Sequence, residues 1–103
     1  MHEVMSFRKI CTATINGKRW DIGFGYPGKT KGKIDQGVCR YYSRRIVLHR
    51  KVKGRKCSII DLAVHELLHA HVPSLKEEVV NEFGELVARV LPKLIEAEEN
   101  SQK

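Results

Sequence analysis

The chain changes its hydrophobic pattern near residue 56, and this change limits the folds that are open to it. Before residue 56, short runs rich in β-branched residues alternate with glycine-rich segments, which is typical of antiparallel sheets. After residue 56, apolar residues recur every three or four positions, which is typical of amphipathic helices. The sequence therefore predicts an α+β fold in which a small antiparallel sheet of three to four strands precedes two helices.

The length of 103 residues is enough for one hydrophobic core but not for two. We therefore expect a single domain over residues 1–103, with a polar tail at about 96–103 that frays. No run of apolar residues approaches the length of a membrane span, and the first residues lack the apolar segment of a signal peptide. These observations predict a cytoplasmic monomer that does not enter a membrane.

The first half of the chain carries the signals of a sheet. Asn16-Gly17 is a strong signal for a two-residue hairpin turn. The segment 25–37 is rich in glycine and lysine, and it is predicted to be a long exposed loop. The predicted strands are 10–16, 19–25, 38–42 and 44–50, the last two being either a pair or one bent strand.

The second half of the chain predicts two helices. Ser58 is expected to cap the first, which runs to about His71. The segment from Ser74 to Glu77 has the pattern of a capping box for the second, which Pro92 is expected to kink or interrupt. The second helix also has a stripe of apolar residues that predicts a buried face. These residues are Val79, Val80, Phe83, Leu86, Val87, Val90, Leu91 and Leu94.

The first predicted helix contains an HExxH motif. Its two histidines are four residues apart, about one helical turn, so both imidazoles project from one face and can bind one metal ion. Glu66 lies about 100° around the helix, where it can reach a metal-bound water without binding the ion itself. The motif predicts a Zn²⁺ site rather than two separate histidines that would each need a polar partner. It reads His65-Glu66-Leu67-Leu68-His69.

These residues and those that follow resemble the zincin metallopeptidases. The resemblance is closest to the small SprT-like or ImmA/IrrE-like single-domain proteins that phages and mobile elements often encode, and it covers about residues 37–92. It implies a zinc hydrolase that acts on the peptide bonds of a protein or peptide, with a strand beside the metal helix that binds extended substrate. We assigned that role to the segment 44–50. The residues that carry the resemblance are His65 to Ala70, Pro73, Leu75 and Glu77-Glu78-x-Val80.

A catalytic zinc normally has three protein ligands and one water. No histidine follows His71, and Leu75 stands where related motifs have a third histidine, so a carboxylate is expected. The candidates are Glu77, Glu78 and Glu82. Glu77 has a role in the capping box, and Glu82 is a turn farther along the helix although it flanks the apolar stripe. We chose Glu78, which best matches the Glu-Glu-x-Val pattern of the resemblance.

The mechanism that the resemblance implies assigns Glu66 as the general base for a zinc-bound water. The zinc holds the developing oxyanion, and Tyr41, Tyr42 and His71 are the candidates for a further donor to it. An alternative function of the same motif is a zinc-stabilised scaffold that binds a partner without catalysis.

Charge is divided unevenly between the two halves of the chain. Residues 1–56 hold 15 Lys and Arg against 3 Asp and Glu, while residues 57–103 hold 4 against 9. A basic half of this kind favours an acidic partner, with nucleic acid as the first candidate. The alternative is that these basic residues only keep the chain soluble.

Overall fold

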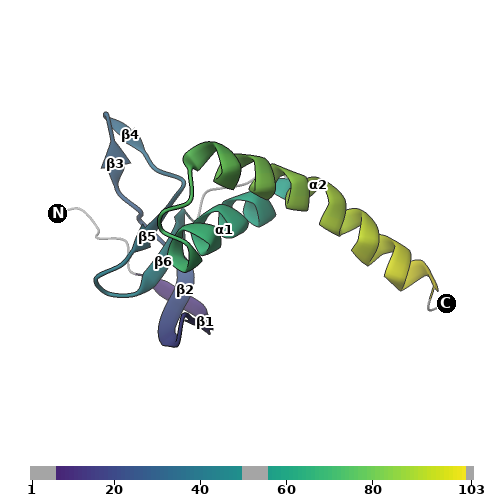
Figure 1. The fold of residues 1–103 in the computed structure, drawn as a ribbon, viewed down its shortest axis with the longest axis horizontal. Helices are drawn as coiled ribbons and strands as arrows, with labels where there is room; N and C mark the ends of the chain where they lie inside the picture. The colour runs from purple at the N-terminus through teal and green to yellow at the C-terminus, as the bar shows by residue number, and fades with distance from the viewer. Residues whose placement is uncertain (1–6, 50–55, 102–103) are drawn as a thin grey trace.

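The computed structural model describes residues 7–49 and 56–101, and Figure 1 shows their arrangement. Six strands come first and two helices follow, so the predicted α+β class and element order are confirmed. The strands are β1 (Arg8–Ile15), β2 (Lys18–Gly25), β3 (Lys29–Thr30), β4 (Lys33–Ile34), β5 (Gly37–Arg40) and β6 (Arg45–His49). The helices are α1 (Lys56–His71) and α2 (Glu77–Ser101).

Four of the strands form one sheet in the order β1-β2-β6-β5. The β1-β2 and β5-β6 pairs are antiparallel, but β2 and β6 run parallel, with Ile22 opposite Ile46. The prediction of an antiparallel sheet is therefore wrong for its central pair. The error arises because β5 lies between β2 and β6 in the chain but beyond β6 in the sheet, where it forms a hairpin with β6. Apolar alternation within a strand does not reveal the direction of its neighbour.

The segment 25–37, predicted as a loop, contains a second two-stranded sheet formed by β3 and β4. Its turn places Lys31 at φ 53° and Gly32 at φ 81°, the left-handed conformations that a tight hairpin needs. The predicted Asn16-Gly17 turn has the same character, with φ of 53° and 79°. In Figure 1 the β3-β4 hairpin projects away from the four-stranded sheet.

The hydrophobic core lies between the four-stranded sheet and α1. Ile46 on the central strand β6 is fully buried, and Trp20, Leu48 and Ala70 pack with it. Helix α1 contacts β5 and β6, so it lies across the β5 side of the sheet. This contact sets the position of α1, which carries the HExxH motif, over the sheet and its rotation about its own axis.

Both helices begin at positions other than those predicted. Helix α1 begins at Lys56, two residues before Ser58. Helix α2 begins at Glu77, where the amide of Val80 donates to the carbonyl oxygen of Lys76 at 3.1 Å. The residue that caps α2 is therefore Lys76, and the predicted capping box with Ser74 does not form.

Helix α2 is one continuous helix of 25 residues. It passes through Pro92 without interruption and continues to Ser101, beyond the point where the sequence predicts a frayed end. Proline at this position removes one helical hydrogen bond, and the rest of the helix is retained. Among the residues that the structure describes, no helix has the length and apolar character needed to cross a membrane.

Contact between α2 and α1 runs along a narrow row of small or fully buried residues. Val80, Gly84 and Ala88 are buried in it, and Gly84 lies against the side chain of Asp61 on α1. The burial predicted for the apolar residues of α2 is wrong for most of them. The exposed members are Val79, Phe83, Leu86, Val90, Leu91 and Leu94, with exposed fractions between 39% and 60%.

Candidate metal centre

Helix α1 brings the two motif histidines onto the same face, as predicted. His65 and His69 are one turn apart, and their Nε2 atoms are separated by 3.1 Å. Their rings meet edge to face with centroids 4.7 Å apart. Both side chains are only about one-fifth exposed. The two nitrogen atoms therefore converge on one partly sheltered point.

The carboxylate of Glu77 completes this group from the first residue of α2. Its Oε2 atom lies 3.1 Å from Nε2 of His65, and its Oε1 atom lies 3.1 Å from Nε2 of His69. A carboxylate at the first turn also interacts favourably with the helix dipole. The chain reaches this position because it turns back directly after α1, at residues 72–76.

The structure brings Glu77 to the histidines where the sequence led us to choose Glu78. Within the described part of the chain, the group that can hold a metal is His65, His69 and Glu77. Glu78 and Glu82 lie on the exposed surface of α2. One residue along a helix is a rotation of about 100°, so Glu77 and Glu78 cannot both point at the same site. We passed over Glu77 because we assigned it to a capping box that does not form.

The donor atoms fit a zinc ion in both type and spacing. All of them lie within 4.8 Å of one another. Tetrahedral Zn²⁺ holds its nitrogen and oxygen ligands at about 2.0–2.2 Å, which places ligand atoms about 3.3–3.5 Å apart. Separations of 3.1 Å are close to that arrangement. Two imidazoles and one carboxylate also leave a fourth position for water or substrate, as in catalytic zinc sites.

Glu66 is the buried carboxyl group beside this cluster, with an exposed fraction of only 6%. Its Oε2 atom lies against Gly37 on β5, 3.2 Å from where a Cβ atom would be. Burial, followed by the carboxylates of Glu77 and Asp35, raises the pKa of Glu66 from 4.5 to about 7. A cation held nearby would lower this pKa again. In the absence of a metal, Glu66 therefore changes its protonation state near neutral pH.

Strand β5 and the residue after it line the site opposite α1. Gly37, Cys39 and Tyr41 alternate along the chain: Gly37 contacts Glu66, Cys39 lies near Glu66, and Tyr41 reaches the end of the motif. We did not identify Gly37, Cys39 or Asp35 as site residues from the sequence. The spacing of residues 37, 39 and 41 predicts that they share one face of a strand. It does not predict which helix packs against that face.

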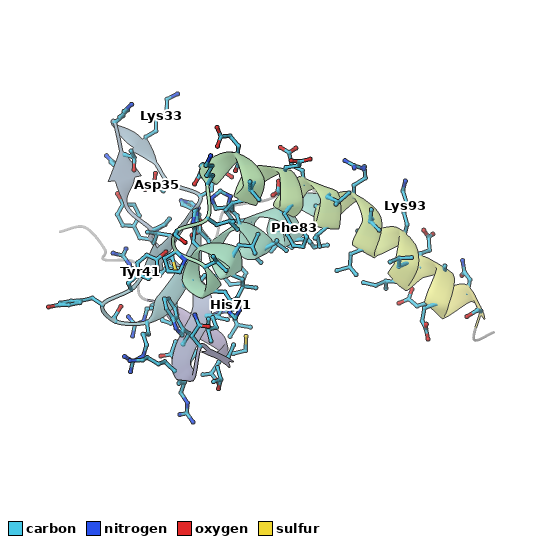
Figure 2. The ribbon with its side chains drawn as sticks, in the orientation of Figure 1. Lys33, Asp35, Tyr41, His71, Phe83 and Lys93 are labelled. Atoms are coloured by element: carbon cyan, nitrogen blue, oxygen red, sulfur yellow. The ribbon has the colours of Figure 1, made fainter. Side chains whose placement is uncertain are left out.

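Two side chains from the sheet bind the last turn of α1. The hydroxyl of Tyr41 donates to the carbonyl oxygen of His69, and Nδ2 of Asn16 donates to that of His71. Figure 2 labels Tyr41 and His71 in this region. Tyr42 is fully exposed and His71 lies on the surface. Within the described residues, no hydrogen bond joins the side chain of Tyr41, Tyr42 or His71 to the side chain of His65, His69 or Glu77.

The strand that we assigned to substrate binding lies inside the sheet. β6, at Arg45–His49, pairs with β2 on one side and β5 on the other, so its backbone groups are already used. β5 is the edge strand next to α1. Among the described strands, the place beside α1 where a peptide strand could add is therefore the edge strand β5 and not the segment 44–50.

Comparison of the chain with protein-family models, with curated proteins and with solved structures found no match. The resemblance to zincin metallopeptidases therefore remains a prediction from the motif. What is known of the site comes from this chain's own geometry: the three converging ligand atoms, the buried carboxyl group and the edge strand beside them.

Proposed function

We propose that this protein is a zinc-dependent peptidase whose metal ligands are His65, His69 and Glu77. The observation that carries the proposal is the placement of both Glu77 oxygen atoms 3.1 Å from the two histidine nitrogens. A carboxylate that only interacted with the N-terminus of α2 would not need to lie against two converging imidazole nitrogens. The buried carboxyl group of Glu66 beside them distinguishes this site from an ion pair on the surface.

Zn²⁺ in this position would polarise a substrate carbonyl and lower the pKa of water to about 7. Glu66 accepts the proton of the attacking water and then delivers it to the leaving amine. The position of its side chain against Gly37 suits this role, because burial shields the carboxyl group from bulk water.

The substrate class follows from the position of β5 at the edge of the four-stranded sheet among the residues that the structure describes. An extended peptide can add to this edge through main-chain hydrogen bonds, which requires no particular side chain. Gly37 lies at the start of β5 and directly against Glu66, so a peptide on this edge passes close to the general base. We therefore assign extended protein segments or unfolded proteins as the substrate.

The experiment that tests the proposal combines zinc content with hydrolysis of an unfolded protein such as casein. The purified chain should hold about one zinc per molecule and lose hydrolysis on chelation. Glu66→Gln should keep the zinc and lower hydrolysis by roughly 10²–10⁴-fold. Glu85→Gln makes the same chemical change at an exposed position of α2 and should leave both unchanged.

Two results would contradict this assignment. Zinc-loaded protein without any hydrolysis would favour the non-catalytic zinc scaffold. Loss of zinc from Glu66→Gln would mean that Glu66 supports the fold or binds the metal, and that it is not the general base.

Nucleic acid is a second candidate partner, and the exposed lysines of the β3-β4 hairpin favour it. Lys29, Lys31 and Lys33 are all exposed, and none has an ion pair in the part of the chain described. Figure 2 shows Lys33 on the projecting hairpin. Binding to DNA should weaken steeply with salt, and replacing the three lysines with glutamine should reduce that dependence. Absence of binding at low salt would exclude this partner.

A further inference from the structure

Helix α2 carries an apolar surface that no described part of the chain covers. We define it as the α2 stripe, and its exposed fractions range from 39% to 60%. Contiguous apolar surface of this kind usually marks an interaction site. The members of the α2 stripe are Val79, Phe83, Leu86, Val90 and Leu94.

The α2 stripe lies on a different side of the helix from the contact with α1. At about 100° per residue, its centre lies about 120° around the helix axis from the buried row that includes Val80 and Gly84. Glu77 lies on the α1 side. A partner on the stripe therefore does not have to cover the metal centre.

The second half of α2 also extends beyond α1. Figure 1 shows this part of the helix projecting away from the rest of the molecule. Leu94 and Ile95 in this extension are 60% and 48% exposed. A projecting helix gains little stability from its own hydrogen bonds in water, and most helical stability comes from the packing of an apolar face. The projecting part therefore favours a partner that is itself long and helical.

The spacing of the α2 stripe is self-complementary when two copies of α2 run antiparallel. If Phe83 lies opposite Val90 of the second copy, then Val79 lies opposite its Leu94. The stripes of the two copies then contact each other over about four helical turns, and Leu86 of each copy lies near the two-fold axis. An interface of this kind is isologous, because each copy contributes the same surface.

The charges beside the α2 stripe select the same arrangement. Glu82, Arg89 and Lys93 all lie on one flank of the stripe, at about 60–100° from its centre. In the antiparallel register, Glu82 lies at the level of Leu91 of the second copy, and so between its Arg89 and Lys93. In a parallel pair in register, this flank of one copy lies on the opposite side of the interface from the same flank of the other copy. Glu82 then does not meet Arg89 or Lys93 of the second copy, and the pairing of charges is lost.

We propose that two copies of this chain form a homodimer through the α2 stripe, with the two helices antiparallel. Glu82 of each copy then pairs with Arg89 and Lys93 of the other. This proposal differs from the monomer expected from the sequence. The dimer does not depend on the zinc site, since the stripe and Glu77 lie on different sides of α2.

The test is the molar mass in solution, measured by light scattering and sedimentation over a concentration series. The wild-type chain should be a dimer. Phe83→Gln with Val90→Gln should be monomeric, and its helical circular dichroism should fall by no more than the contribution of the projecting second half of α2. Ile95→Gln is the matched control, since it removes an equally exposed apolar residue about 140° from the centre of the stripe. It should remain dimeric.

Charge reversal tests the antiparallel register in variants whose changes are all on the surface. Glu82→Lys should weaken the dimer by about tenfold or more, because it places like charges together. Adding Arg89→Glu and Lys93→Glu to the same chain should restore it. A wild-type chain that is monomeric up to millimolar concentration would overturn the proposal. If the double glutamine variant is still a dimer, the interface is not the α2 stripe. If the added Arg89→Glu and Lys93→Glu changes do not restore the dimer, the antiparallel register is wrong.

Discussion

The hydroxyl group of Tyr41 donates a hydrogen bond of 2.8 Å to the backbone carbonyl oxygen of His69. This bond connects the end of β5 to the last turn of α1, where backbone carbonyl groups have no partner within the helix. Trp20 packs edge to face on the Tyr41 ring, with centroids 5.9 Å apart, and so holds it in place. The sheet thereby sets the position of one proposed metal ligand.

Replacing Tyr41 with phenylalanine should therefore destabilise the protein. The ring and its contact with Trp20 remain, while the carbonyl oxygen of His69 loses a donor. The expected loss is about 0.5–1.5 kcal/mol in the free energy of unfolding, measured with urea in the presence of a chelator. Tyr42→Phe is the control, because the Tyr42 side chain is fully exposed. Equal effects of the two changes would contradict the structural role of this bond.

The choice between two adjacent glutamates gives a direct test of the metal centre. Glu77→Gln removes an oxygen ligand and should lower zinc affinity by more than the roughly 10–100-fold caused by losing an outer-sphere partner. Glu78→Gln, an identical change one residue away on the exposed surface, should lower it little. Competition with a zinc-binding dye measures both. The reverse ranking would show that α2 begins at a different residue in the zinc-bound protein.

Cys39 should react slowly with alkylating reagents. Burial, the largest effect on this group, raises the pKa of the Cys39 thiol from 9.0 to about 11. Only the thiolate is nucleophilic, so little of Cys39 is reactive at pH 8, and its rate should rise steadily as the pH approaches 11. Iodoacetamide should modify the exposed Cys11 first, as mass spectrometry of the peptides would show. In concentrated urea the difference should disappear. Equal rates in the folded protein would mean that β5 does not shield the thiol.

Gly84 is the residue that allows α2 to approach α1. A Cβ atom there would lie 2.5 Å from Oδ1 and 3.2 Å from the carbonyl oxygen of Asp61. Gly84→Ala should therefore destabilise the protein by about 1–3 kcal/mol, although alanine favours helices by about 1 kcal/mol. Asp61→Ala in the same chain should recover part of the loss, because it removes the nearer atom. Thermal unfolding of the two single variants and the double variant completes the cycle. A gain in stability from Gly84→Ala alone would show that the helices are farther apart.

Local features of the fold were predictable because they depend on neighbours in the chain. The Asn16-Gly17 turn formed as expected, since both residues accept positive φ. His65 and His69 share a face because four residues complete about one turn of any helix. Pairing of β2 with β6 was missed because strand direction is decided by the route of the intervening chain.

Helical periodicity was sufficient to predict that α1 presents two histidines and a glutamate, because these relations depend only on spacing along the chain. Tertiary structure alone decided that Glu77 rather than Glu78 faces them. That choice depends on where α2 begins, and the start of α2 depends on how the turn after α1 packs. Tertiary structure also decided that the α2 stripe is exposed. An apolar pattern predicts that a face of a helix is buried, but it does not identify the surface that covers this face.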